Sequence, residues 1–125
     1  MKLVGKIDRE KFKAVSKHIT TDEVVITDER IAHIEQRHPG AYERFSPYIQ
    51  EVLESPDYVL EASRPKTAVL LKDIVVDGQK IKLILRLVAH NDPDGYKNSV
   101  LSLWKIDEKE WQRLLRSKKV LYKSE

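Results

Sequence analysis

The chain has 125 residues, of which 41% are hydrophobic and 34% charged, and it contains 23 Lys and Arg, 20 Asp and Glu, and no cysteine. This length predicts a single domain, residues 1–125, and the lack of cysteine excludes a disulfide framework, a thiolate metal site and a cysteine nucleophile. No apolar run is long enough for a signal peptide core or a membrane span, so we expect a cytoplasmic protein without membrane contact.

Positive charge is concentrated at the two ends of the chain. Residues 1–20 and residues 96–125 each carry a net charge of +4, whereas residues 21–95 carry −5. The overall net charge of +3 is a weak argument for nucleic-acid binding. A basic groove is therefore expected only if both ends fold next to the middle segment.

The first elements are predicted to be a helix and a short extended segment. Asp8 is a suitable N-cap for a short helix near residues 9–18, which would belong to an N-terminal helical extension over residues 1–23. The stretch "EVVIT" at 23–27 is expected to form a short strand or an extended lead-in to the next helix.

Two further helices are predicted before residue 56. Thr27 is an N-cap, and the helix that follows should run to about His38, because Pro39 disfavours helical geometry at the residue before it and Gly40 allows the exit. A second helix is expected with Ser46 as its cap and Pro47 in its first turn. Its apolar face holds Ile49, Val52 and Leu53, and Tyr42 and Phe45 can extend that face upstream.

The second half of the chain predicts strands and one closing helix. Asp77-Gly78 lies between two apolar runs and is a strong signal for a β-hairpin. Asp107 with Glu110 predicts a capping box at the start of the last helix. We expect an α+β domain in which N-terminal helices pack on a four-stranded antiparallel meander and a C-terminal helix closes the fold. The strands are expected near 58–62, 67–76, 79–90 and 96–106.

The hairpin register predicts which side chains share a sheet face. If Asp77-Gly78 is a two-residue turn, Asp73 lies opposite Lys82. In the last strand, Leu101 and Leu103 are expected to face the core. One open face should then hold a guanidinium, an amide, a hydroxyl and an indole, which together can bind a phosphate and stack a base. These side chains are Arg86, Asn98, Ser102 and Trp104. Alternation of polar residues on any half-exposed strand is an equally ordinary explanation.

The helix over 28–38 has an unusual set of side chains. His33 and Arg37 are adjacent on its surface, and Arg30 lies on the same stripe. His38 lies at the C-terminal end of the helix. The two histidines are five positions apart and diverge by roughly 140°, which differs from the i, i+4 spacing of a two-histidine zinc motif. We therefore expect no metal and no cofactor, and each histidine remains either functional or merely structural.

Three short elements of the sequence are specific: a His-x-x-x-Arg-His-Pro element at 33–39, a Ser-Pro-Asp turn at 55–57 and an Asn-Ser-x-x-Ser strand at 98–102. With these elements, the chain resembles the phage-associated branch of the barnase–EndoU–colicin–RelE-like nuclease superfamily over residues 24–123. Similar sequences often have Thr where this chain has Ser102. The resemblance implies a metal-independent ribonuclease or toxin, phage-borne or mobile, with helices ahead of a four-stranded antiparallel sheet.

The expected chemistry is RNA cleavage by attack of the substrate's own 2′-hydroxyl. His33 and His38 share the acid and base roles, since the pKa of imidazole lies near working pH. The remaining catalytic residues are expected to be Arg86, which binds the scissile phosphate, and Ser102, which donates a hydrogen bond to it. The substrate-binding residues are expected to be Arg37, Asn98, Trp104, Lys82 and Lys105, with Arg113 and Arg116 as further phosphate contacts and His90 as a reserve catalytic candidate.

Two alternatives to this hydrolase remain open. The domain is either a non-catalytic module that binds nucleic acid or protein, or a phage-derived structural module whose histidines organise a helix junction. RNA is the partner that the resemblance implies, and a toxin would require a cognate inhibitor or immunity protein. The residues do not distinguish RNA from DNA, nor do they indicate the oligomeric state.

Overall fold

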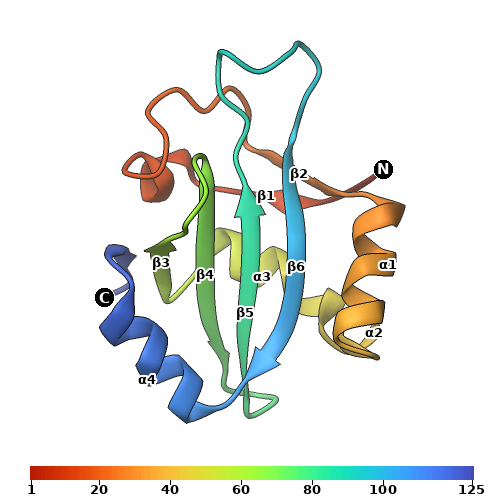
Figure 1. Cartoon of the computed structure of the whole chain (residues 1–125), viewed down its shortest axis with the longest axis vertical. Helices are drawn as coiled ribbons and strands as arrows, with labels where there is room; N and C mark the ends of the chain where they lie inside the picture. Colours follow the sequence, from red (N-terminus) through yellow and green to blue (C-terminus); the bar gives the residue numbers. More distant parts are fainter.

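The computed structural model describes all residues 1–125 and contains a seven-stranded sheet with helices on both faces (Figure 1). The strand order is β1-β2-β6-β5-β4-β3-β7, and only β2 and β6 pair in parallel. The strands are β1 (Lys2–Lys6), β2 (Glu23–Ile26), β3 (Tyr58–Glu61), β4 (Thr67–Ile74), β5 (Gln79–Arg86), β6 (Asn98–Ile106) and β7 (Val120–Lys123). The helices are α1 (Asp28–Arg37), α2 (Ala41–Phe45), α3 (Ile49–Glu54) and α4 (Glu108–Ser117), with short 3-10 turns η1 (Arg9–Phe12) and η2 (Ser46–Tyr48).

The predicted α+β class is confirmed, but the predicted arrangement of its elements is wrong. The sheet has seven strands instead of four, and the first element is β1, a strand. β1 pairs with β2, and β7 pairs with β3, so the two ends of the chain form opposite edges of the sheet. Both edge strands are short, which is why their apolar pattern is too brief to recognise in the sequence.

The helix predicted over 9–18 is reduced to the single turn η1. Asp8 is its N-cap as predicted and accepts a hydrogen bond from the Glu10 backbone amide. The chain then turns away from helical geometry, because the Arg9 guanidinium donates to the Ile19 carbonyl at 3.0 Å and Ile19 forms a bridge with Ala89. Long-range contacts with the sheet therefore override the local helical signal in this segment.

The second predicted helix is divided into three pieces. It begins at Ala41, directly after Gly40, whose φ is 81°, and not at Ser46. Pro47 lies in the 3-10 turn η2, where its missing amide hydrogen breaks the regular helical bonding between α2 and α3. Pro47 therefore marks an interruption in the helix instead of its start.

The β4–β5 hairpin has a four-residue turn in place of the predicted two-residue turn. Ile74 pairs with Gln79, so Asp73 lies opposite Lys80 and not opposite Lys82. The Asp77 amide donates to the Ile74 carbonyl, which closes a longer turn. A shift of two positions leaves every side chain on its predicted face, because the side-chain period of a strand is two.

The two faces of the sheet are covered unequally. The main core lies on one face, where α1, α2 and α3 bury side chains such as Ile34, Phe45 and Leu53. On the other face, α4 buries Trp111 and Leu114 against β3 and β4 only. The neighbouring part of that face, over β5 and β6, has no helix above it (Figure 1). We call this part the open face.

A bulge in β6 changes which of its residues reach the open face. Ile84 pairs with Ser102 but Leu85 pairs with Val100, so Leu101 is an extra residue. Beyond the bulge the side-chain alternation is reversed, and Val100 faces the main core. Asn98 is fully buried, which corrects the prediction that it lies on the open face. Arg86, Ser102 and Trp104 do belong to the open face, since Arg86 pairs with Ser99 and Trp104 with Lys82.

Candidate nuclease active site

Helix α1 is anchored so that it presents its two histidines beside β6. The Thr27 hydroxyl accepts a hydrogen bond from the Arg30 amide at 3.1 Å and caps the helix as predicted. Ile34 is fully buried, whereas His33 is half-buried and Arg37 is exposed. Helix α1 follows β2, which runs parallel to the start of β6, so α1 continues along the rest of β6 (Figure 1).

The turn after α1 is held by the Glu35 carboxylate, which has no recognisable role in the sequence. The two Glu35 side-chain oxygens accept hydrogen bonds from the backbone amides of Gly40 at 2.9 Å and Tyr42 at 3.0 Å. The His38 amide still bonds to the Ile34 carbonyl, but its φ of −137° ends the helix. Glu35 therefore fixes the short segment that contains His38.

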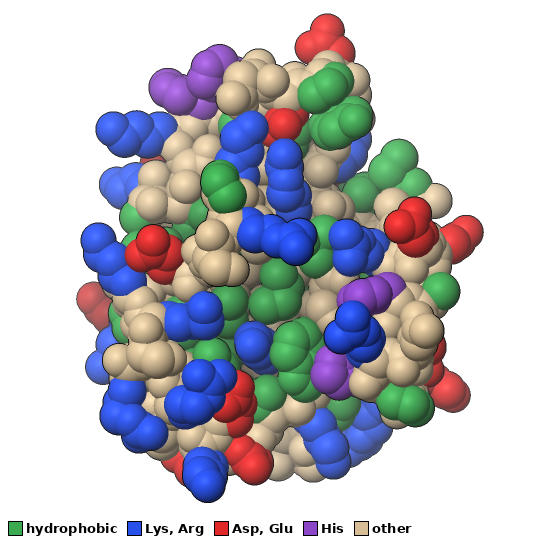
Figure 2. Space-filling model, in the orientation of Figure 1, with side chains coloured by type: hydrophobic (Ala, Val, Ile, Leu, Met, Phe, Trp, Pro, Cys, Tyr) green, Lys and Arg blue, Asp and Glu red, His purple; other side chains and the backbone are tan.

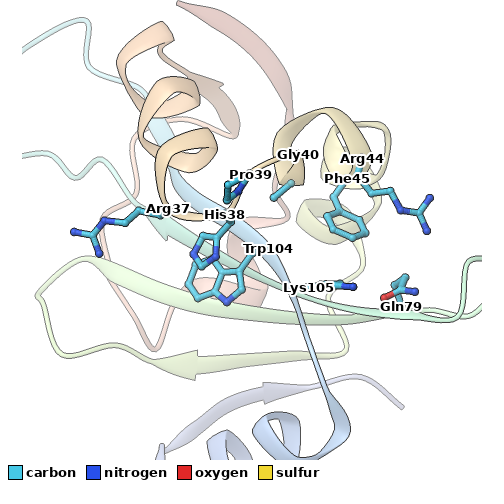
Figure 3. A pocket seen from close by; sticks show the side chains of 10 residues that line it. Arg37, His38, Pro39, Gly40, Arg44, Phe45, Gln79, Trp104 and Lys105 are labelled. Carbon is cyan, nitrogen blue, oxygen red and sulfur yellow. The ribbon is translucent and has the colours of Figure 1, made fainter.

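His38 stacks on Trp104 from β6. The two ring centroids are 4.4 Å apart and the rings are inclined by only 7° (Figure 3). The Lys82 ammonium lies 4.9 Å from the centroid of the same indole. Trp104 thus uses one face of its indole ring to hold His38. A substrate base can stack only on the part of the ring that His38 does not cover, which restricts the predicted role of Trp104 as a platform.

The surroundings of His38 favour its neutral form. Burial lowers the pKa of His38, and the positive charges of Arg37, His33 and Lys82 lower it further. Burial also lowers the pKa of Lys82, although Glu110 opposes that shift. A neutral imidazole with a free ring nitrogen is a competent proton acceptor.

A pocket of about 540 Å³ opens beside the stack and is lined by three cationic side chains and no carboxylate. Figure 3 shows Arg37 and Lys105 on opposite sides of the His38–Trp104 stack. The Arg44 guanidinium contacts Asp77 at 2.9 Å, which leaves Arg37 and Lys105 without a carboxylate partner. Residues 21–95 are acidic on average, but none of their carboxylates lines this pocket. The pocket therefore suits an anion. Its lining residues are Arg37, His38, Pro39, Gly40, Ala41, Arg44, Phe45, Gln79, Trp104 and Lys105.

Ser102 and Arg86 lie farther along the open face. Ser102 is half-buried and its hydroxyl makes no hydrogen bond within the protein. The Arg86 guanidinium is held by the Asp92 carboxylate at 3.1 Å, and this contact keeps the pKa of Asp92 well below its usual range. Arg86 lies at the end of the open face away from His38, because it pairs with Ser99 whereas Trp104 is farther along β6.

Two predicted residues lie outside this cluster. The Asn98 side chain accepts from the Val88 amide and donates to the Thr21 and Glu23 carbonyls, at 2.8, 2.8 and 3.0 Å, so it joins β2 to the end of β5. His90 packs edge-on against His18, with ring centroids 4.7 Å apart. Histidines appear at two separate places in Figure 2, one beside α1 and one at the opposite end of the molecule.

Some properties of this site depend on contacts that no local pattern reveals. Glu35 and Arg44 are ordinary helix-surface residues in the sequence, and only the turn at 38–40 gives Glu35 its two amide partners.

The structure contains no cluster of three His, Cys, Asp or Glu side chains arranged to hold a metal ion. No helix is long and apolar enough to cross a membrane.

Comparison with known proteins gives one match. A family model described as phage-Barnase-EndoU-ColicinE5/D-RelE like nuclease2 matches residues 1–123, which includes β1 as well as the segment on which the resemblance rests. No curated protein and no solved structure matches the chain. A match over nearly the whole chain, together with the His38–Trp104 site, leads to one conclusion: the chain belongs to this phage-associated nuclease family.

Proposed function

We propose that the chain is a metal-independent endoribonuclease in which His38 is the general base and His33 the general acid. The observation that carries this proposal is the His38–Trp104 stack beside a pocket lined by cations and no carboxylate. His38 has the lowered pKa that a base needs near neutral pH. The charge of His33 contributes to that shift, which supports the assignment of both imidazoles to one site.

The proposed reaction is an in-line transesterification. His38 removes the proton from the ribose 2′-hydroxyl, the 2′-oxygen forms a bond to phosphorus, and the bond from phosphorus to the 5′-oxygen breaks. His33 gives a proton to the departing 5′-oxygen. The products are a 2′,3′-cyclic phosphate and a free 5′-hydroxyl, and no water or metal enters this step.

Charge that accumulates on the non-bridging phosphate oxygens needs donors close to the stack. Arg37 and Lys105 line the pocket on either side of it, and Lys82 lies over Trp104. Ser102 is two residues from Trp104 on the same face and has a free hydroxyl to donate. These groups are the proposed phosphate ligands, because preformed donors in a partly buried site stabilise a developing anion.

In a cell, such a nuclease requires restraint by an inhibitor protein.

The test compares cleavage of a mixed-sequence RNA oligonucleotide with cleavage of the same oligonucleotide carrying 2′-deoxyribose throughout. Both are incubated with EDTA and with wild type, His38→Ala or His18→Ala. His18 is an exposed histidine in the separate pair with His90 and serves as the matched control. Loss of a general base is expected to reduce the rate by about 10²–10⁴-fold.

We expect the wild type and His18→Ala to cleave only RNA, to leave 2′,3′-cyclic ends, and to be much faster than His38→Ala. Cleavage of the deoxy substrate, or equal rates for His38→Ala and wild type of matched melting temperature, would contradict the mechanism. Binding of RNA without any cleavage would favour a nucleic-acid-binding module instead.

A further inference from the structure

A second basic surface lies on the open face, at the end away from the His38–Trp104 stack. It is a groove of about 910 Å³, lined by five cationic side chains and one carboxylate, that of Glu29. Tyr96, with 59% of its surface exposed, lies in the same lining. We call this surface the basic groove, and its cations are Arg30, Arg64, Lys66, Arg86 and Lys97.

Part of the basic groove is built by fixed side chains. Lys66 adopts a φ of 58°, which is uncommon for a residue other than glycine, and its carbonyl accepts a hydrogen bond from the Leu87 amide at 2.7 Å. Its ammonium and the Arg86 guanidinium both contact Asp92, at 3.4 and 3.1 Å. Two cations share one carboxylate here, so a positive charge remains after this pairing. The strained backbone is compensated by these contacts, as at many binding sites.

Two other cations of the groove are free to meet a ligand. Neither Arg30 nor Arg64 forms an ion pair with a carboxylate in the protein. Lys97 is paired with Glu23. The lining thus keeps an excess of positive charge without an internal anion to neutralise it, and such a groove attracts a polyanion.

The basic groove is continuous with the site at His38. On α1, Arg30, His33 and Arg37 form one stripe about 10 Å long, which joins the groove to the pocket. On the sheet, Arg86 and Lys82 lie about 13 Å apart along β5, with Ser99 and Ser102 of β6 beside them. Figure 2 shows Lys and Arg side chains gathered across this face as far as the histidines beside α1.

We propose that the basic groove binds the phosphate backbone of single-stranded RNA next to its scissile phosphate, with Tyr96 stacking on one flanking base. The inference rests on the proposed function, since it takes the His38 site as the place of cleavage. Phosphates of a stacked strand advance about 3.4 Å each, so a track of this length holds about three or four of them. An exposed tyrosine beside a basic track is the combination that single-strand binders use without sequence preference.

The test measures binding and cleavage separately. Binding of a fluorescein-labelled mixed-sequence decaribonucleotide is followed by anisotropy in a His38→Ala background, which prevents cleavage. The groove variant is Arg64→Gln/Tyr96→Ala, and Arg64→Lys retains the charge. Lys17→Gln, another exposed cation without an ion pair, is the matched control. Cleavage rates of the decamer and of a ribodinucleotide are then compared in the same variants with His38 retained.

We expect the groove variant to bind the decamer at least tenfold more weakly, and Arg64→Gln alone to reduce the slope of log K against log salt by about 0.7. Arg64→Lys should retain most of the binding, and dinucleotide cleavage should be unchanged, because that substrate does not reach the groove. A decamer that binds but is never cut would refute the proposed function while supporting the groove. Unchanged decamer binding, or equal losses with decamer and dinucleotide, would overturn the inference and leave the groove for an acidic protein partner.

Discussion

At the scale of single residues, the pKa of His38 is the property most open to measurement. Burial lowers that pKa, and the charges of Arg37, His33 and Lys82 add to the effect. Lys82→Met removes one positive charge and retains the aliphatic stem, so the pKa of His38 should rise. An NMR titration of the imidazole should then move to higher pH, and the acid limb of the kcat/KM profile should move with it.

The sign of the accompanying stability change is also determined. The folded state disfavours protonated His38, so the unfolded state binds more protons as the pH falls through the ordinary imidazole range near about 6.5. Stability due to this group is present above that range and is lost below it. An unchanged titration curve in Lys82→Met, with Lys17→Met as the control, would show that the charge of Lys82 does not contribute to the shift.

Asn98 and Ser102 test whether residues of the same predicted face have different roles. Asn98 is fully buried and makes three hydrogen bonds, so Asn98→Ala should lower the free energy of unfolding by about 3 kcal/mol. Ser102→Ala removes a hydroxyl without a protein partner and should change stability by less than about 0.5 kcal/mol. Urea denaturation of both variants measures the difference, and similar losses would contradict the assignment.

At the scale of elements, the turn between α1 and α2 controls the site through Glu35. Glu35→Ala removes the acceptor for the Gly40 and Tyr42 amides and should lower the unfolding free energy by about 1 kcal/mol. We expect RNA cleavage to fall at least tenfold, because small displacements of a catalytic group are costly. Gln36→Ala, an exposed neighbour, is the control. A stability loss without loss of cleavage would show that the turn does not position His38.

Elements whose signals are local were predictable from the sequence. Thr27 and Asp107 both cap their helices as predicted, through hydrogen bonds to the amides of Arg30 and Glu110. The second half of the expected capping box is replaced, since the Glu110 carboxylate pairs with Arg113. Cap residues act within one turn of chain, so their effect is visible in a single sequence.

Features that depend on distant residues were not predictable. The bulge at Leu101 reverses the side-chain alternation of β6, which moves Asn98 into the core and brings Ser99 to the open face. The stack of His38 on Trp104 joins residues far apart in the chain, and no periodicity indicates it. Candidate residues of the site were therefore identifiable by type, but their partners were not.

At the scale of the whole molecule, the first 22 residues are part of the fold. Ile7, Phe12 and Ile19 are buried in the main core, and β1 pairs with β2, the strand that leads into α1. Three such side chains contribute roughly 6 kcal/mol, a large share of a typical total stability. A chain lacking residues 1–22 should therefore show no cooperative thermal transition by circular dichroism, whereas Leu3→Ser should melt normally, because Leu3 is exposed.

The parallel pairing of β2 with β6 has a consequence for synthesis on the ribosome. The ribosome makes His33 and His38 early. It makes β6, which aligns α1 and carries the Trp104 indole on which His38 stacks, late, at residues 98–106. A nascent chain that ends before this strand contains the imidazoles without the surface that orients them. Assembly of the site therefore waits until most of the chain has left the exit tunnel, and a shorter nascent chain lacks the complete site.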